Sequence, residues 1–196
     1  DAYAVPMIRS VMNRSDWLIL LVLAVIWGGA FMFIGVAVRH VQPLTYVWAR
    51  VSIAAVAMFL FLRLKGQPLG LPREVWGSMF LLALLNNALP FTLFGWGQTH
   101  IASGLASILN ATTPIWGVVV AHVFTSDERM TPRKIAGVLL GFAGVATMIG
   151  PALLANIGTD ALAQLACITA SLSYALAAVW ARRFRRMGLS PMSVTT

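Results

Sequence analysis

The stretch that decides the fold is HIASGLASILNATTPIWG, residues 100–117, which opens an apolar run that continues to Phe124. Serine, asparagine and threonine side chains stand in the middle of this run, at a depth where lipid offers no hydrogen-bond partner. Each of these polar groups needs a partner from the protein or from water. The pattern therefore predicts a membrane-spanning segment that faces a polar pathway.

The composition of the 196-residue chain also predicts a membrane protein. With 59% apolar and 10% charged residues, the chain has too little polar surface for a soluble domain. Six segments approach the length of about 20 apolar residues that the hydrocarbon core of a bilayer requires. They are residues 17–38, 45–62, 75–97, 102–124, 135–149 and 161–181. All acidic residues lie outside these segments, and the expected fold class is an all-α polytopic membrane protein.

The net charge of +8 raises the question of a nucleic-acid partner, which the distribution of the basic residues answers. If the N-terminus lies in the cytoplasm, twelve of the fourteen lysines and arginines fall on the cytoplasmic side, and only Arg39 and Arg50 fall toward the opposite face. This asymmetry follows the positive-inside rule. It predicts a multi-pass protein of the cell inner (plasma) membrane, with a cytoplasmic N-terminus, the lipid bilayer as partner and no nucleic acid.

The sixth apolar segment weakly repeats the first, which indicates an internal repeat. The matched pairs are Trp27 with Tyr174, Arg39 with Arg186, and Pro43 with Pro191. Five spans per copy is an odd number, so the second copy enters the membrane in the opposite sense. The predicted organisation is a cytoplasmic segment (1–16), a first five-helix repeat (17–150), a linker (151–160) and the incomplete start of an inverted second repeat (161–196).

Several short motifs together indicate a family. They are Trp27-Gly28, Pro43 with Arg50, Ala102-Ser103 with Ala106-Ser107, Thr113-Pro114, Glu128-Arg129, Thr131, and Gly137 with Gly141 and Gly144. On these residues, about 17–192 of the chain resembles the EamA family of the drug/metabolite transporter superfamily. The resemblance implies ten spans in two inverted halves and export of amino acids or other small metabolites. The chain stops where a seventh span would begin, which implies a missing second half or a second copy of the chain as partner.

Candidate binding residues follow from depth in the membrane, at about 1.5 Å per helical residue. Seven polar or aromatic residues lie near the midplane and are predicted to bind substrate: Trp27, Asn86, Asn87, Asn110, Thr113, Ser171 and Tyr174. For each asparagine alone, the alternative is a hydrogen bond between helices, worth less than about 2 kcal/mol. For the group as a whole, we expect a polar pathway.

Prolines, glycines and one arginine inside the spans are further candidates. Pro90 and Pro114 each remove a main-chain hydrogen bond, which predicts a kinked or broken helix that serves as a hinge or only as a packing kink. A glycine series in the fifth segment, Gly137, Gly141 and Gly144, predicts close helix packing. Arg50 is expected to extend toward the outer face or to cap carbonyl groups there, with attraction of an anionic group as the alternative.

The sequence offers no enzymatic constellation. No acidic residue lies in any apolar segment, no His-Glu-x-x-His motif is present, and no phosphate-binding glycine loop occurs. We therefore expect neither catalysis nor a metal or cofactor. The predicted function is a membrane transporter that exports amino acids or related small metabolites by alternating access. The alternative is a polytopic membrane protein with a structural or regulatory role that moves no solute.

Overall fold

The computed structural model describes residues 12–66, 73–125, 129–149 and 160–187. These residues form helices and short connections, which confirms the predicted all-α fold class. The elements are α1 (Arg14–Ala37), α2 (Pro43–Leu64), η1 (Arg73–Val75), α3 (Trp76–Ala83), η2 (Leu84–Ala88), α4 (Leu89–Gly97), α5 (Ser103–Asn110), α6 (Thr113–Phe124), α7 (Pro132–Ile149) and α9 (Ala161–Arg186).

Five of the predicted spans coincide with helical segments that are long and apolar enough to cross a membrane. These segments are Arg14–Ala37, Pro43–Leu64, Arg73–Gly97, Ser103–Phe124 and Ala161–Phe184. The third combines η1, α3, η2 and α4, and the fourth combines α5 and α6. Residues 135–149 lie in α7, which is not among the five, so its membrane crossing stays a prediction.

Local sequence explains where the first helices begin and end. Asn13 caps α1, and its main-chain N–H donates to the Asp16 carboxylate at 2.8 Å, which completes a capping box. Pro43 opens α2 at a position where no main-chain donor is needed. After α2, Gly66 adopts a φ of 62°, the left-handed conformation that commonly ends a helix and that glycine tolerates best.

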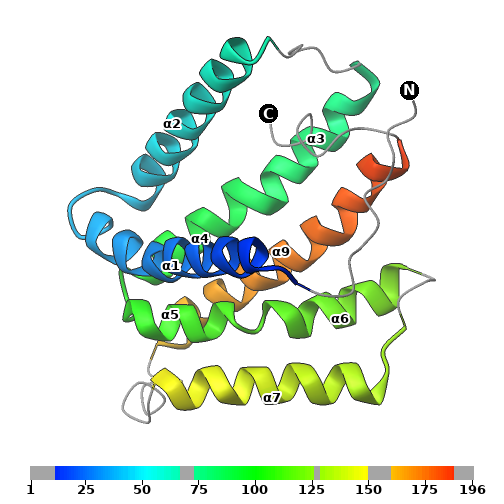
Figure 1. Cartoon of the computed structure of the whole chain (residues 1–196). Coiled ribbons are helices and arrows are strands. Elements are labelled where there is room, and N and C mark those ends of the chain that lie inside the picture. Colours follow the sequence, from blue (N-terminus) through cyan, green and yellow to red (C-terminus); the bar gives the residue numbers. More distant parts are fainter. Residues whose placement is uncertain (1–11, 67–72, 126–128, 150–159, 188–196) are drawn as a thin grey trace.

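Helix α9 occupies the centre of the structure. Figure 1 shows it running beside α3 and α4 and crossing α5 and α6, and its contacts with α4, α5, α6 and η2 agree with this view. Gly97 of α4 lies close against α9, where an added Cβ would be 2.7 Å from Cys167 Sγ and 3.3 Å from the Ala163 carbonyl oxygen. The apolar core gathers here, with Phe94, Leu105 and Cys167 almost fully buried.

The predicted packing role of the α7 glycines is not seen in the described part of the chain. Cβ atoms added to Gly137, Gly141 and Gly144 would meet nothing within 4 Å. These glycines lie on an exposed face of α7, whereas Val138 on the same helix is half-buried. The reason is rotational: the sequence places glycines in register along one face, and α7 turns another face toward α5 and α6 (Figure 1).

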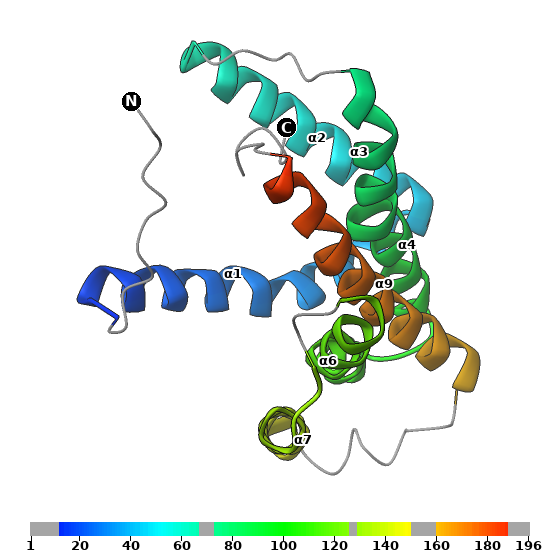
Figure 2. The same cartoon turned by 90° about the vertical axis from the view of Figure 1, so that its right-hand side faces the viewer.

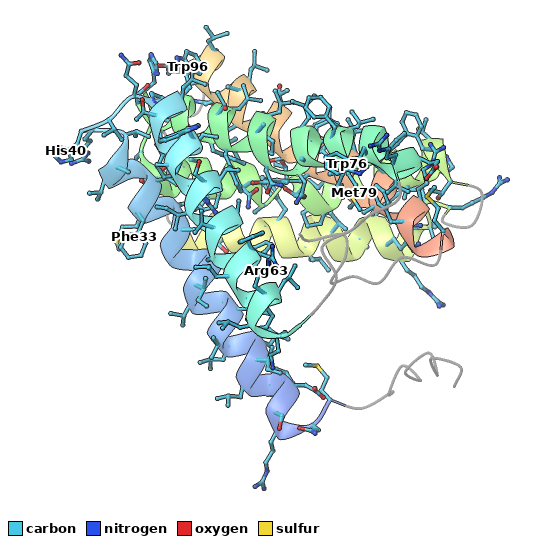
Figure 3. All side chains as sticks on the ribbon, turned by 90° about the horizontal axis from the view of Figure 1, so that it is seen from above. Phe33, His40, Arg63, Trp76, Met79 and Trp96 are labelled. Atoms are coloured by element: carbon cyan, nitrogen blue, oxygen red, sulfur yellow. The ribbon has the colours of Figure 1, made fainter. Side chains whose placement is uncertain are left out.

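Helix α1 projects from the body of the structure. Figure 2 shows its N-terminal half extending away from the other helices, and its buried residues, Ile34 and Gly35, lie near its C-terminal end. The outer surface is apolar, as a lipid-facing surface requires. Figure 3 shows Phe33 directed outward from α1; this side chain is 67% exposed, and Trp76 of α3 is 65% exposed.

Candidate functional site

A cavity of about 810 Å³ lies among α1, α2, η2, α4, α5, α6 and α9, a volume typical of small-molecule sites. Its wall contains six of the seven predicted binding residues and one predicted hinge: Trp27, Asn86, Asn87, Asn110, Thr113, Pro114 and Tyr174. These residues come from four separate spans. The structure therefore brings together positions that the sequence related only by their depth, while their role in binding stays a prediction.

Two predicted site residues lie outside the cavity wall. Ser171 is fully buried, and its hydroxyl donates to the carbonyl oxygens of Leu109 at 3.1 Å and Cys167 at 3.0 Å. It therefore joins helices rather than facing the cavity, because α9 turns it toward α5. Pro90 is also buried, in the first turn of α4. Both residues lie at a suitable depth along their helices, but neither lines the cavity.

Both prolines coincide with interruptions of their spans. Before Pro90 the helix widens into the π-helical turn η2, and before Pro114 the chain breaks at residues 111–112 between α5 and α6. In a regular α-helix each proline ring would clash with the carbonyl four residues earlier, which belongs to Asn86 or Asn110. The asparagines of the cavity wall thus stand where the helices cannot be regular. Motion at these points, the predicted hinge role, stays a prediction.

Side-chain hydroxyls supply donors that the interrupted helices lack. Within η2, the Leu89 N–H bonds to the Leu84 carbonyl, and Pro90 has no N–H to offer the carbonyl of Leu85. Ser173 donates to that Leu85 oxygen at 2.7 Å. At the second break, the Thr113 hydroxyl donates to the Asn110 carbonyl at 2.7 Å. These two hydrogen bonds satisfy main-chain carbonyl groups at the interruptions and so stabilise the irregular backbone beside the cavity.

Aromatic rings form the floor of the cavity. Phe94 stacks on Tyr174 with ring centroids 6.2 Å apart and planes 23° apart, and Phe31 meets Phe94 edge-on at 5.2 Å. Such ring contacts fix three side chains from α1, α4 and α9 in one rigid apolar surface. A ligand with an apolar body can lie against this surface without a large loss of side-chain entropy.

Arg50 lines the cavity, whereas the sequence had favoured an orientation toward the outer face. The alternative expectation, attraction of an anionic group, stays a prediction. Arg50 Nη1 donates to the Tyr46 hydroxyl at 2.7 Å, and the guanidinium carbon lies 4.0 Å from the centroid of the Phe91 ring. The signal available in the sequence was the spacing of Tyr46 and Arg50, four residues apart on one helical face.

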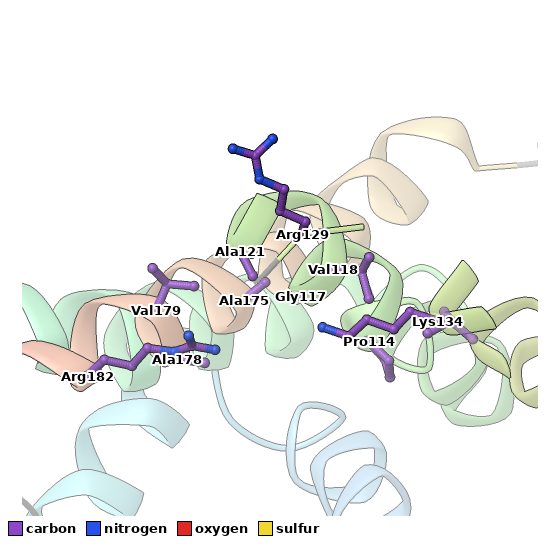
Figure 4. A pocket seen from close by; sticks show the side chains of 11 residues that line it. Pro114, Gly117, Val118, Ala121, Arg129, Lys134, Ala175, Ala178, Val179 and Arg182 are labelled. Carbon is purple, nitrogen blue, oxygen red and sulfur yellow. The ribbon is translucent and has the colours of Figure 1, made fainter. Parts of the chain in front are cut away.

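A smaller pocket of about 310 Å³ adjoins the cavity and shares Pro114, Gly117, Ala175 and Ala178 with it. Its wall also contains three basic residues, Arg129, Lys134 and Arg182. Figure 4 shows Lys134 and Arg182 reaching into the pocket from opposite sides, whereas Arg129 points away. The wall that the large cavity shares with this basic pocket thus consists of glycine, alanine and proline residues.

The described residues contain no group of three His, Cys, Asp or Glu side chains that could hold a metal ion. Acidic residues are also missing from the cavity wall, because Asp16, Glu74 and Asp160, the ones that the structure describes, lie elsewhere. The chemistry that the wall offers is therefore hydrogen bonding through amides and hydroxyls, a single guanidinium charge, and aromatic contact.

Residues 15–150 match the EamA-like transporter family. The chain belongs to this family. The matched region runs from α1 to the end of α7, so it includes most of the cavity wall, and α9 contributes Tyr174, Ala175 and Ala178 from beyond it.

Similar proteins carry transporter names. The uncharacterized transporter YoaV of Bacillus subtilis is 29% identical over 170 residues, which cover 86% of this chain and 58% of YoaV. A protein of Streptantibioticus cattleyicolor named "probable terminal-alkyne amino-acid exporter" is 30% identical, over 70% of this chain and 45% of its own length. A protein of Escherichia coli named "probable amino-acid metabolite efflux pump" is 26% identical, over 70% and 44%.

The chain spans about half the length of the curated relatives that it matches. No solved structure matches it significantly.

Proposed function

We propose that this chain forms part of an inner-membrane transporter that exports amino acids or related small metabolites by alternating access. The observation that carries the proposal is the 810 Å³ cavity, whose wall holds three asparagines at the interruptions of two spans. Interrupted helices that meet at a midplane cavity are the usual substrate sites of membrane carriers. The names of the relatives supply the substrate class.

The hydrogen bonds of the asparagines favour transport over a purely structural role. If these residues only joined helices, their side chains would bond across helix interfaces. In the described part of the chain, Asn86 and Asn87 side chains make no hydrogen bond, and the Asn110 oxygen accepts only from Thr113 of the same span at 3.4 Å. Their amides are therefore available to a solute or to water inside the cavity.

The proposal includes a partner for α1. Trp27 lines the cavity and yet is 72% exposed, so one wall is incomplete in the described residues. A further set of helices, either a second half or a second copy of this chain, would cover that side. The proposed membrane is the inner membrane, with the N-terminus in the cytoplasm, on the support of the basic-residue asymmetry.

The test uses the complete gene product, reconstituted in liposomes and assayed for exchange of radiolabelled L-phenylalanine, L-methionine and L-threonine. We expect exchange of at least one amino acid above the rate of protein-free liposomes. Thr147→Ala is a suitable control, because Thr147 is exposed and bonds only to its own helix. A complete, folded protein that exchanges none of a full amino-acid panel would overturn the proposal.

A further inference from the structure

We infer that Arg50 makes this cavity selective for a ligand that carries a carboxylate on an apolar body. The inference rests on the proposed function, which it deepens by naming the group that the site recognises. It begins from position: Arg50 lies within the Pro43–Leu64 span, is half-buried, and lines the cavity. A charge at such a depth is costly, and in membrane proteins it usually faces a partner or a solute pathway.

The immediate contacts of Arg50 fix the guanidinium without neutralising it. The Tyr46 hydroxyl takes one Nη1 hydrogen bond, and the Phe91 ring covers the group at 4.0 Å. Both partners are uncharged, and a guanidinium has five N–H donors. Its remaining edge can therefore serve a further acceptor while the ring and the hydroxyl hold its plane.

The charge balance of the cavity identifies the acceptor. Among the described residues that line the cavity, Arg50 is the single charged one. A positive charge in a largely apolar space binds an anion preferentially, since the anion restores neutrality where water is scarce. A carboxylate matches the planar guanidinium with two parallel hydrogen bonds, a geometry that arginine provides and lysine does not.

The rest of the wall indicates what the carboxylate is attached to. Phe31, Phe94 and Tyr174 form a fixed aromatic surface, which suits an apolar side chain. Asn87 and Asn110 also line the cavity, and their amide oxygens can accept from an ammonium group. An apolar amino acid satisfies all three features, and an apolar carboxylic acid without the ammonium satisfies the two that Arg50 and the rings provide.

The experiment measures binding separately from transport, by the shift in melting temperature of the complete protein in detergent. The probes share one apolar body: 3-phenylpropanoate carries only a carboxylate, 2-phenylethylamine only an ammonium, and L-phenylalanine both. We expect the wild type to bind 3-phenylpropanoate about ten- to a hundredfold more tightly than 2-phenylethylamine. Arg50→Gln should reduce that preference to within about threefold, and Arg50→Lys should retain part of it.

Arg63→Gln is the matched control. Arg63 lies on the same helix and also stacks on a phenylalanine, Phe59 at 5.3 Å, but it does not line the cavity, so this variant should keep the wild-type preference. Equal binding of acid and amine by the wild type, or an unchanged preference in folded Arg50→Gln, would overturn the inference.

The two proposals fail in different ways. If Arg50→Gln does not fold, Arg50→Lys decides the inference: a preference below that of the wild type supports it, and an unchanged preference overturns it. Selective binding of the acid without exchange of any amino acid would refute transport and leave the Arg50 assignment standing. Exchange of an amino acid without selectivity for the acid would refute the Arg50 assignment and leave the transport proposal standing.

Discussion

The hydroxyl of Ser173 on α9 donates a hydrogen bond of 2.7 Å to the main-chain carbonyl of Leu85, inside the π-helical turn of the third span. Two residues earlier on α9, Ser171 reaches the Leu109 carbonyl beside the break of the fourth span at 3.1 Å. Each carbonyl lies five residues before a proline. One helix therefore supports both interruptions that bound the cavity.

Ser173→Ala is expected to destabilise the protein by about 0.6–1.7 kcal/mol, because the Leu85 carbonyl then loses its donor in an apolar setting. The measurement is the melting temperature of the purified protein in detergent. Thr169→Ala on the same helix is the control: Thr169 is exposed and bonds only to Leu165 of α9. Equal losses in the two variants would argue against a special role for Ser173.

Gly97→Ala is expected to cost about 1–3 kcal/mol, because its Cβ would lie 2.7 Å from Cys167 Sγ. Removing the sulfur with Cys167→Ala should restore part of the stability in the double variant. By contrast, Gly141→Ala should be neutral or slightly stabilising, since Gly141 faces open space and alanine favours helix. Thermal unfolding of the four proteins measures the difference, and a tolerated Gly97→Ala would contradict the close contact.

Asn87→Ala, Asn110→Ala and Trp27→Ala in the complete protein should each reduce amino-acid exchange while leaving membrane abundance and melting temperature nearly unchanged. The reason is that all three line the cavity, so their side chains face a solute or water and contribute little to packing between helices. Flux in liposomes and fluorescence-detected chromatography give the two readouts. Loss of stability along with flux would instead indicate that these residues join helices.

Membrane topology provides a prediction that does not depend on the cavity. A reporter fused after Arg186 should lie in the cytoplasm, and one fused within residues 150–160 should lie on the periplasmic side, because basic residues are retained in the cytoplasm. Paired alkaline phosphatase and green fluorescent protein fusions distinguish the two sides. The opposite pattern would also contradict the inverted repeat.

Several features of this protein follow from the sequence alone, because they depend on properties local to the chain. Hydropathy over about 20 residues identified five spans that the structure contains. The missing N–H of Pro90 and of Pro114 required an interruption in each span, wherever the neighbouring helices lie. Depth also follows from counting, since each helical residue advances about 1.5 Å, and this placed Asn87 and Asn110 at the level of the cavity.

Direction around each helix axis was decided only by tertiary packing. Ser171 and Tyr174 share a depth on α9, yet the first faces the Leu109 carbonyl and the second faces the cavity. Gly97 meets Cys167 and Gly141 meets nothing, although both are helical glycines. Arg50 lines the cavity, where the ring of Phe91 from another span covers its guanidinium. Lipid outside a helix and protein beside it are both apolar, so hydropathy alone cannot distinguish these faces, and only the neighbouring helices fix the rotation.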